Sequence, residues 1–198
     1  MTTVDKLHHS SESDNEEDVP NVNYVVPPAK PLNALLELDK DDEALERYKA
    51  TLLGKTASGT VIIDAGDPSK VILNRVELIS EGREPLVMTF NQAEEAKFTV
   101  KEGAEYRLRF YFYVQRDIVT GLKYTHKVKK SVMTVDKVKY MFGSFPPSTE
   151  LHYSETPVEE APKGFVHRGS YKVHSEITDD DGHVYQSWAW TLKLSSEW

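Results

Sequence analysis

The sequence contains no cysteine among its 198 residues. Disulfide bonds and thiolate chemistry are therefore excluded, and with them a secreted scaffold held together by disulfides. No stretch approaches the roughly 18 consecutive apolar residues of a membrane-spanning helix, and the first ten residues lack the basic and then apolar order of a signal peptide. There is also no Asn-x-Ser/Thr glycosylation site. These absences predict a cytoplasmic protein without stable membrane insertion.

The motifs of common enzyme classes are absent as well. The chain has no Gly-x-Ser-x-Gly, no His-Glu-x-x-His and no Gly-rich phosphate loop. The acidic run at 179–181 looks like part of a calcium loop, but Ile177 stands where the EF-hand pattern requires an acidic ligand. We therefore interpret this run as a solvated turn. We expect a protein that is not an enzyme and that carries neither a metal nor a cofactor.

The net charge of −8 is unevenly distributed. Residues 1–59 hold 6 Lys+Arg and 12 Asp+Glu, a balance of −6, whereas residues 60–198 hold 18 and 20, a balance of −2. The sequence shows no basic cluster of the kind that phosphate backbones need, which argues against nucleic acid as a partner. A basic partner surface fits this charge, and solubility alone would explain it equally well.

Residues 1–59 are predicted to form an N-terminal arm that is separate from the strand-forming remainder of the chain. We expect residues 1–30 to be disordered, because the acidic run at 12–18 and the proline-broken segment after it bury too little apolar surface. Two short helices are predicted at about 31–38 and 40–53, the first opening on Pro31 and the second capped by Asp39. Such short helices are marginal alone, so they need a surface, either their own domain or a partner protein.

From about residue 60 the apolar residues recur with the period of two that is typical of β-strands. The clearest case is AEYRLRFYFYVQR at 104–116, and Asp181-Gly182 between two alternating runs is a strong hairpin signal. We predict an all-β fold, an immunoglobulin-like antiparallel β-sandwich over residues 60–198. Its interior could be a filled core or a hydrophobic ligand pocket, and the pattern does not separate these. The other predicted strands are 71–80, 86–90, 97–100, 118–128, 132–140, 149–154, 170–178 and 183–194.

Five stretches of the chain, in order, resemble segments of the Rho GDP-dissociation inhibitors. They are LDKDDEALERYKATLLG (38–54), VKEGAEYRLRFYFYVQRDIVTGLKY (100–124), VDKVKYMFGSF (135–145), TPVEEAPKGFVHRGSY (156–171) and TDDDGHVYQSWAW (178–190). The resemblance implies a protein that binds prenylated, GDP-bound Rho or Rac GTPases in a one-to-one complex and is monomeric alone. It further implies that the sandwich buries the geranylgeranyl lipid between its sheets. The arm then lies on the GTPase switch regions, GDP release is blocked, and the GTPase leaves the membrane.

The same resemblance implies three groups of site residues. The prenyl pocket corresponds to the apolar and aromatic positions Leu78, Phe98, Tyr106, Ile118, Val166 and Trp190. The contact with the GTPase switch regions corresponds to Tyr24, Leu38 and Asp42. An acidic rim for the basic residues that precede the partner's prenyl cysteine corresponds to Glu159, Glu160 and Asp180. A prenyl chain in water costs about 0.8 kcal/mol per exposed CH₂, so a pocket of this kind could compete with a bilayer.

The chain departs from the family pattern at a few turn positions, among them His167 and Gly182, which bear on rim charge and partner preference. Two other readings remain open at this point. A general prenyl or acyl-protein carrier of similar fold would bind prenylated peptides without the GTPase body and without the arm. A structural immunoglobulin module would have a filled core and would not respond to lipid.

Overall fold

The computed structural model describes residues 43–44, 47, 61–90 and 95–198. Ten strands and one short 3-10 helix occupy the last two ranges. They are β1 (Val71–Ser80), β2 (Leu86–Thr89), β3 (Lys97–Lys101), β4 (Glu105–Val114), β5 (Val119–Lys130), β6 (Met133–Phe145), β7 (Ser148–Glu155), β8 (Glu159–Glu160), η2 (Phe165–His167), β9 (Gly169–Thr178) and β10 (Val184–Ser195). All predicted strands are present, and the structure adds the two-residue strand β8, which is too short to leave an alternating pattern.

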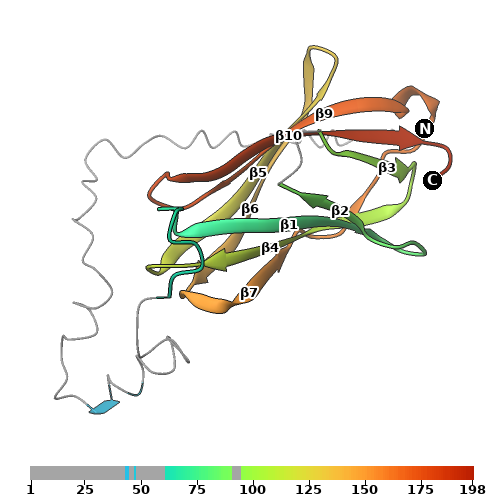
Figure 1. Cartoon of the computed structure of the whole chain (residues 1–198). Helices are drawn as coiled ribbons and strands as arrows, with labels where there is room; N and C mark the ends of the chain where they lie inside the picture. The colour runs from blue at the N-terminus through green and yellow to red at the C-terminus, as the bar shows by residue number, and fades with distance from the viewer. Residues whose placement is uncertain (1–42, 45–46, 48–60, 91–94) are drawn as a thin grey trace, which may run out of the picture.

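The strands form two sheets that pack face to face (Figure 1). Sheet 1 has the order β2-β1-β4-β7, with β8 pairing the end of β4, and sheet 2 has the order β3-β10-β9-β5-β6. All neighbours are antiparallel except β3 and β10, which run parallel. The predicted all-β sandwich is therefore confirmed, with one parallel pair that the sequence did not indicate.

Alternation along the strands sends one set of side chains into the space between the sheets. In β4 the buried set is Leu108, Phe110, Phe112 and Val114, as the sequence predicted. Sheet 2 contributes Leu122 and Tyr124 from β5, and further buried residues from β9 and β10. Tyr124 has no exposed surface and contacts five aromatic rings, with centroids 4.5 Å from Phe110, 5.4 Å from His126 and 6.1 to 6.5 Å from Phe142, Trp188 and Tyr140.

The register of the strands gives the sandwich two distinct ends. At one end, Thr178 faces both Lys123 and Val184, so the start of β5 lies beside the turn between β9 and β10. We call this the Asp179 end, after the buried residue of that turn. At the other end, Lys129 faces Lys172, and the β5–β6 turn lies nearby. We call this the hairpin end.

Most of the predicted arm lies outside the described residues. Of the second predicted helix, Glu43, Ala44 and Arg47 are described, and all three are helical. Arg47 and Glu43 form an exposed ion pair of 3.4 Å with the i,i+4 spacing of a helix. Within the described part of the chain, no helix has the length and apolar character needed to cross a bilayer.

Candidate functional site

Three of the predicted pocket residues lie together in the interior, toward the hairpin end. Leu78 on β1, Phe98 on β3 and Trp190 on β10 are only 0%, 4% and 3% exposed. The rings of Phe98 and Trp190 are in contact, with centroids 5.5 Å apart. All three belong to the continuous apolar cluster between the sheets. In this structure their side chains are covered, so a lipid that enters between the sheets must displace side chains or separate the layers.

A short chain of polar groups crosses this apolar interior. The Trp190 indole Nε1–H donates to Ser175 Oγ at 3.0 Å, and the Tyr124 hydroxyl lies 2.9 Å from the same oxygen. Ser175 and Tyr124 are completely buried, and burial raises the pKa of Tyr124. Because each polar atom has a partner, the indole and the phenol can be buried without an unpaired group.

The two sheets are joined at their edge by one carboxylate. The Tyr106 hydroxyl, on β4 of sheet 1, donates to Glu159 Oε2 at 2.9 Å. The Tyr140 hydroxyl, on β6 of sheet 2, donates to the other oxygen, Oε1, of the same carboxylate. We call these three residues the inter-sheet tie. It links β6 of sheet 2 to β4 and β8 of sheet 1 at this edge.

Both tyrosines of the tie keep their protons at neutral pH. Burial is the main cause that raises the pKa of each hydroxyl, and the nearby Glu159 carboxylate raises both further. A protonated phenol that donates to a carboxylate forms a charge-assisted hydrogen bond, which is stronger than a neutral one. A hollow of about 220 Å³ adjoins Tyr106 and is lined in part by Ser80 and the exposed Val158. The tie thus lies at the boundary between interior and solvent.

Two aromatic side chains that contact Tyr124 each have a buried nitrogen without a hydrogen-bond partner among the described residues. These nitrogens are Nδ1 of His126 and Nε1 of Trp188. Burial lowers the pKa of His126 although Glu159 and Asp136 oppose the shift, so the ring is neutral at pH 7. The interior around Tyr124 is therefore aromatic, with two nitrogen atoms that have no hydrogen-bond partner there.

The remaining pocket positions lie away from this group. Ile118 is half-buried just before β5, where its N–H donates to Asp117 Oδ1 at 2.8 Å, and it lies outside the core cluster. Val166 lies on η2 with 60% of its surface exposed, and its carbonyl accepts from Lys130 Nζ at 2.7 Å. These two residues flank opposite ends of β5, whose 12 residues would span about 40 Å if straight. The six positions thus follow the long axis of the sandwich and do not surround one compact cavity.

The three acidic rim positions do not lie together either, because Glu159 and Glu160 lie on β8 and Asp180 lies in the turn between β9 and β10. Glu159 holds the tie, and the adjacent Glu160 forms an exposed ion pair of 2.5 Å with Lys163. Asp180 lies at the Asp179 end, 3.7 Å from Lys123 Nζ. It packs so closely on Gly121 (φ +59°) that a Cβ built there would lie 1.8 Å from its Oδ2, so position 121 requires glycine.

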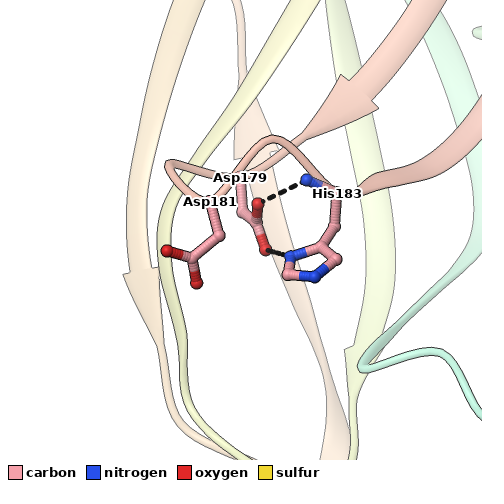
Figure 2. Close-up of side chains that lie close together, drawn as sticks. All are labelled: Asp179, Asp181 and His183. Carbon is pink, nitrogen blue, oxygen red and sulfur yellow. Dashed lines mark hydrogen bonds and ion pairs between the residues drawn. The ribbon is translucent and has the colours of Figure 1, made fainter. Parts of the chain in front are cut away.

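The turn between β9 and β10 contains a second carboxylate that accepts a hydrogen bond from a tyrosine. Figure 2 shows its contacts with His183. Asp179, 3% exposed, accepts from the His183 N–H at 2.9 Å and from the Tyr185 hydroxyl at 2.6 Å, and its Oδ2 lies 3.0 Å from His183 Nδ1. Burial raises the pKa of Asp179, but the bonds from Tyr185 and His183 outweigh it and hold the pKa below its usual value. Asp181 completes a group whose possible ligand atoms lie within 4.8 Å of one another. Hydrogen bonds already occupy Asp179, so this group holds the turn together. The sequence had indicated only a solvated turn.

Several residues of the site were not found from the sequence. Tyr140, Tyr124, Ser175 and His126 all lie on predicted strands at positions that alternation turns inward. An inward polar residue at regular spacing is a signal that could have been used. The hydrogen bonds that join Tyr106 and Tyr140 through Glu159 could not have been predicted in this way, because these residues come from three strands in two sheets. The predicted switch contacts Tyr24, Leu38 and Asp42 lie outside the described residues.

Fold and site together define a two-sheet β-sandwich with an apolar interior and a hydrogen-bonded edge. Comparison with known proteins identifies the family. The family described as RHO protein GDP dissociation inhibitor matches residues 9–197. A probable rho GDP-dissociation inhibitor of Caenorhabditis elegans is 46% identical over 188 residues, covering 91% of this chain and 96% of its own.

Two mammalian proteins show the same likeness. Human Rho GDP-dissociation inhibitor 1 is 40% identical over 190 residues, covering 94% of this chain and 92% of its own length. Bovine Rho GDP-dissociation inhibitor 3 is also 40% identical over 190 residues, covering 92% and 81%. The chain therefore belongs to the Rho GDP-dissociation inhibitor family. It is a regulator of Rho-family GTPases, as the sequence had predicted.

Proposed function

We propose that this protein inhibits GDP release from Rho-family GTPases while burying their geranylgeranyl group between its two sheets. The observation that carries the lipid part is an apolar interior at Leu78, Phe98 and Trp190 whose edge is closed by hydrogen bonds to a single carboxylate. Transfer of a prenyl chain from water gains about 0.8 kcal/mol per CH₂. Such a gain can offset the loss of a few hydrogen bonds, each contributing about 0.5 to 1.5 kcal/mol net.

Glu159 has two roles in this proposal. Its carboxylate ties the sheets together, and it lies where the resemblance places contact with the basic residues before the partner's prenyl cysteine. A cation that pairs with Glu159 would compete with the Tyr106 and Tyr140 hydroxyls for the same oxygens. Arrival of the basic tail would therefore loosen the closure as the lipid arrives. A basic tail that also reached Asp180 would have to extend along the sandwich to the Asp179 end.

The proposed burial of the lipid can be tested through the fluorescence of Trp188 and Trp190. The chain has three tryptophans, and Trp198, at 47% exposure, would contribute solvent-exposed background. In a Trp198→Phe background, a geranylgeranylated, basic C-terminal peptide should change the fluorescence of Trp188 and Trp190 saturably, and the same peptide without lipid should not. No lipid-dependent change, with the protein shown to be folded, would overturn the lipid part.

The arm is the proposed inhibitor of nucleotide release. Asp42→Ala should weaken inhibition of GDP release from a prenylated Rac or Rho protein, because a carboxylate there accepts hydrogen bonds from the switch loop. Asp41→Ala changes the neighbouring charge by the same amount and should have little effect. An equal loss of inhibition in both variants would argue against a specific contact at Asp42. A decrease in the free energy of unfolding that matches the loss of inhibition would argue against it as well.

We further propose a cytoplasmic, monomeric protein that forms a one-to-one complex and carries its GTPase off the membrane. Light scattering of the free protein and of the complex measures the stoichiometry directly. Incubation with membranes that carry prenylated, GDP-bound GTPase should move that GTPase into the supernatant. A GTPase that stays on the membrane and releases GDP at its normal rate would contradict the proposal.

A further inference from the structure

The outer face of sheet 2 is covered with lysines. Cross-strand register places side chains from all five strands on the side away from the core. Those without an ion pair among the described residues are Lys97, Lys101, Lys127, Lys129, Lys137, Lys172 and Lys193. We call these seven residues the lysine face. Two carboxylates share this side of the sheet, Glu176 at 3.2 Å from His174 and Glu95, which accepts from the Thr191 hydroxyl at 3.0 Å.

The lysines are arranged so that like charges face each other. Lys127 lies directly opposite Lys137 on β6 and opposite His174 on β9, and Lys129 lies opposite Lys172. Like charges at directly opposed positions destabilise a sheet. The chain as a whole has a net charge of −8, so a face on which lysines outnumber carboxylates is unexpected on grounds of overall composition. An anionic partner that covers this face would remove the repulsion.

The shape and the edge of this face indicate what that partner is. The face is the broad side of a sheet, and the β5–β6 hairpin stands out beyond its neighbours (Figure 1). Val132 and Met133, beside the tip of this hairpin, are 90% and 68% exposed, and Met141 on the same face of β6 is 58% exposed. Lysines that surround exposed apolar side chains are typical of protein surfaces that lie on anionic membranes.

We propose that the lysine face docks this protein reversibly on an anionic membrane surface, with the tip of the β5–β6 hairpin entering the headgroup region. A protein of net charge −8 is repelled by such a surface unless one side of it is cationic. Docking on this face would orient the sandwich for extraction of a membrane-bound GTPase. The contact itself requires neither the GTPase nor the lipid site, so it can be tested without them.

The test is co-sedimentation of the full chain with two kinds of vesicle, phosphatidylcholine alone and phosphatidylcholine with about one third phosphatidylserine, without GTPase. The wild type should bind only the anionic vesicles at low salt. Each lysine near such a surface contributes about a fivefold change in partitioning. The triple variant Lys127→Gln, Lys129→Gln, Lys172→Gln should therefore partition roughly 100-fold less. Salt that shortens the Debye length from about 30 Å to about 8 Å should release the wild type.

A matched control makes the same change in net charge on the other sheet. Asn74, Val87 and Thr149 are exposed on β1, β2 and β7, and their replacement as Asn74→Asp, Val87→Glu and Thr149→Glu should leave vesicle binding close to wild type. The lysine variant should be no less stable to urea than the wild type, because it removes facing like charges. Inhibition of GDP release measured in detergent should be normal in both variants.

Three results would overturn the proposal. The first is equal binding of the lysine variant and the control variant to anionic vesicles, and the second is no binding by the wild type. The third is coverage of the lysine face by the chain's own acidic arm, detected by amine-reactive labelling of Lys127, Lys129 and Lys172. Protection that is present without vesicles and lost in Glu16→Gln, Glu17→Gln, Asp18→Asn would assign the face to that arm. Protection that appears only with anionic vesicles supports membrane docking.

Discussion

Two carboxylates of the sandwich accept hydrogen bonds from tyrosine, and they differ in what they join. At the Asp179 end, the partners of Asp179 are His183 and Tyr185, four and six residues further along the chain. At the edge between the sheets, Glu159 joins Tyr106 and Tyr140, which are 53 and 19 residues away and lie in different sheets. The first closes a hairpin, whereas the second holds two layers together.

The two carboxylates also differ in how much of each side chain is exposed to solvent. Asp179 is almost completely buried, whereas Glu159 is half-buried and can be reached by a charged group of a partner. A carboxylate that is buried within one turn has no route of release short of unfolding that turn. A half-exposed carboxylate between two layers can exchange partners while each layer remains folded. The comparison therefore separates a structural role for Asp179 from a role in opening the interior for Glu159.

The largest expected effect is on stability at Asp179. Asp179→Ala leaves the His183 N–H and the Tyr185 hydroxyl without their acceptor, and should lower the free energy of unfolding by about 3 kcal/mol. Urea unfolding followed by tryptophan fluorescence measures this. Asp180→Ala, with a side chain 56% exposed, should change it by less than about 0.5 kcal/mol. A similar decrease in the free energy of unfolding in both variants would contradict the structural role assigned to Asp179.

A smaller loss of stability is expected at Glu159. Glu159→Ala removes the acceptor of two tyrosines, but the hydroxyls lie near the surface where water can replace it, so we expect about 1 to 2 kcal/mol. Glu160→Ala is the control, because it removes the same charge at the adjacent residue. It breaks only an exposed ion pair, which contributes less than about 1 kcal/mol to the free energy of unfolding. If Glu159→Ala were no more destabilising than Glu160→Ala, the tie would contribute nothing to closure.

Tyr140→Phe tests the tie without changing any charge. It breaks the bond from sheet 2 to Glu159 and leaves the carboxylate in place, so the layers should separate more readily. A net hydrogen bond of about 0.5 to 1.5 kcal/mol corresponds to an increase of about three- to tenfold in the association rate of a geranylgeranylated peptide. Stopped-flow tryptophan fluorescence measures this rate. Tyr153→Phe, at a tyrosine 63% exposed on β7, should leave the rate unchanged, and an equal increase in both variants would contradict gating by the tie.

The sequence predicted the layers of the fold but not what joins them. Alternation along 104–116 identified which side of β4 faces inward, because the period of a strand depends only on neighbouring residues. The family likeness then indicated the apolar positions Leu78, Phe98 and Trp190, which do lie together. It did not indicate that Ile118 and Val166 lie toward opposite ends of the sandwich, because that depends on the pairing of β5 with other strands.

The lysine face shows the same limit for charge. Residues 60–198 carry almost balanced charges, and no stretch of the sequence reads as a basic cluster. The cluster arises because lysines spaced two apart on β5 face lysines on β6 and β9. Linear composition averages over both faces of a strand, so it cannot reveal a face that is basic on one side only. The same averaging made the buried Asp179 look like part of a solvated acidic turn.

The pH dependence of stability at Asp179 gives the smallest effect. The pKa of Asp179 is lower in the folded protein than in the unfolded chain, although burial opposes the bonds from Tyr185 and His183 and keeps the shift modest. Its stabilisation is therefore complete above the unfolded pKa of about 3.9 and is lost as the pH falls through the folded pKa. The difference in urea midpoint between wild type and Asp179→Asn should be constant from neutral pH to about pH 5 and should narrow in stronger acid. A difference that stayed constant down to about pH 2 would show that the charge of Asp179 does not contribute to the stability of the turn.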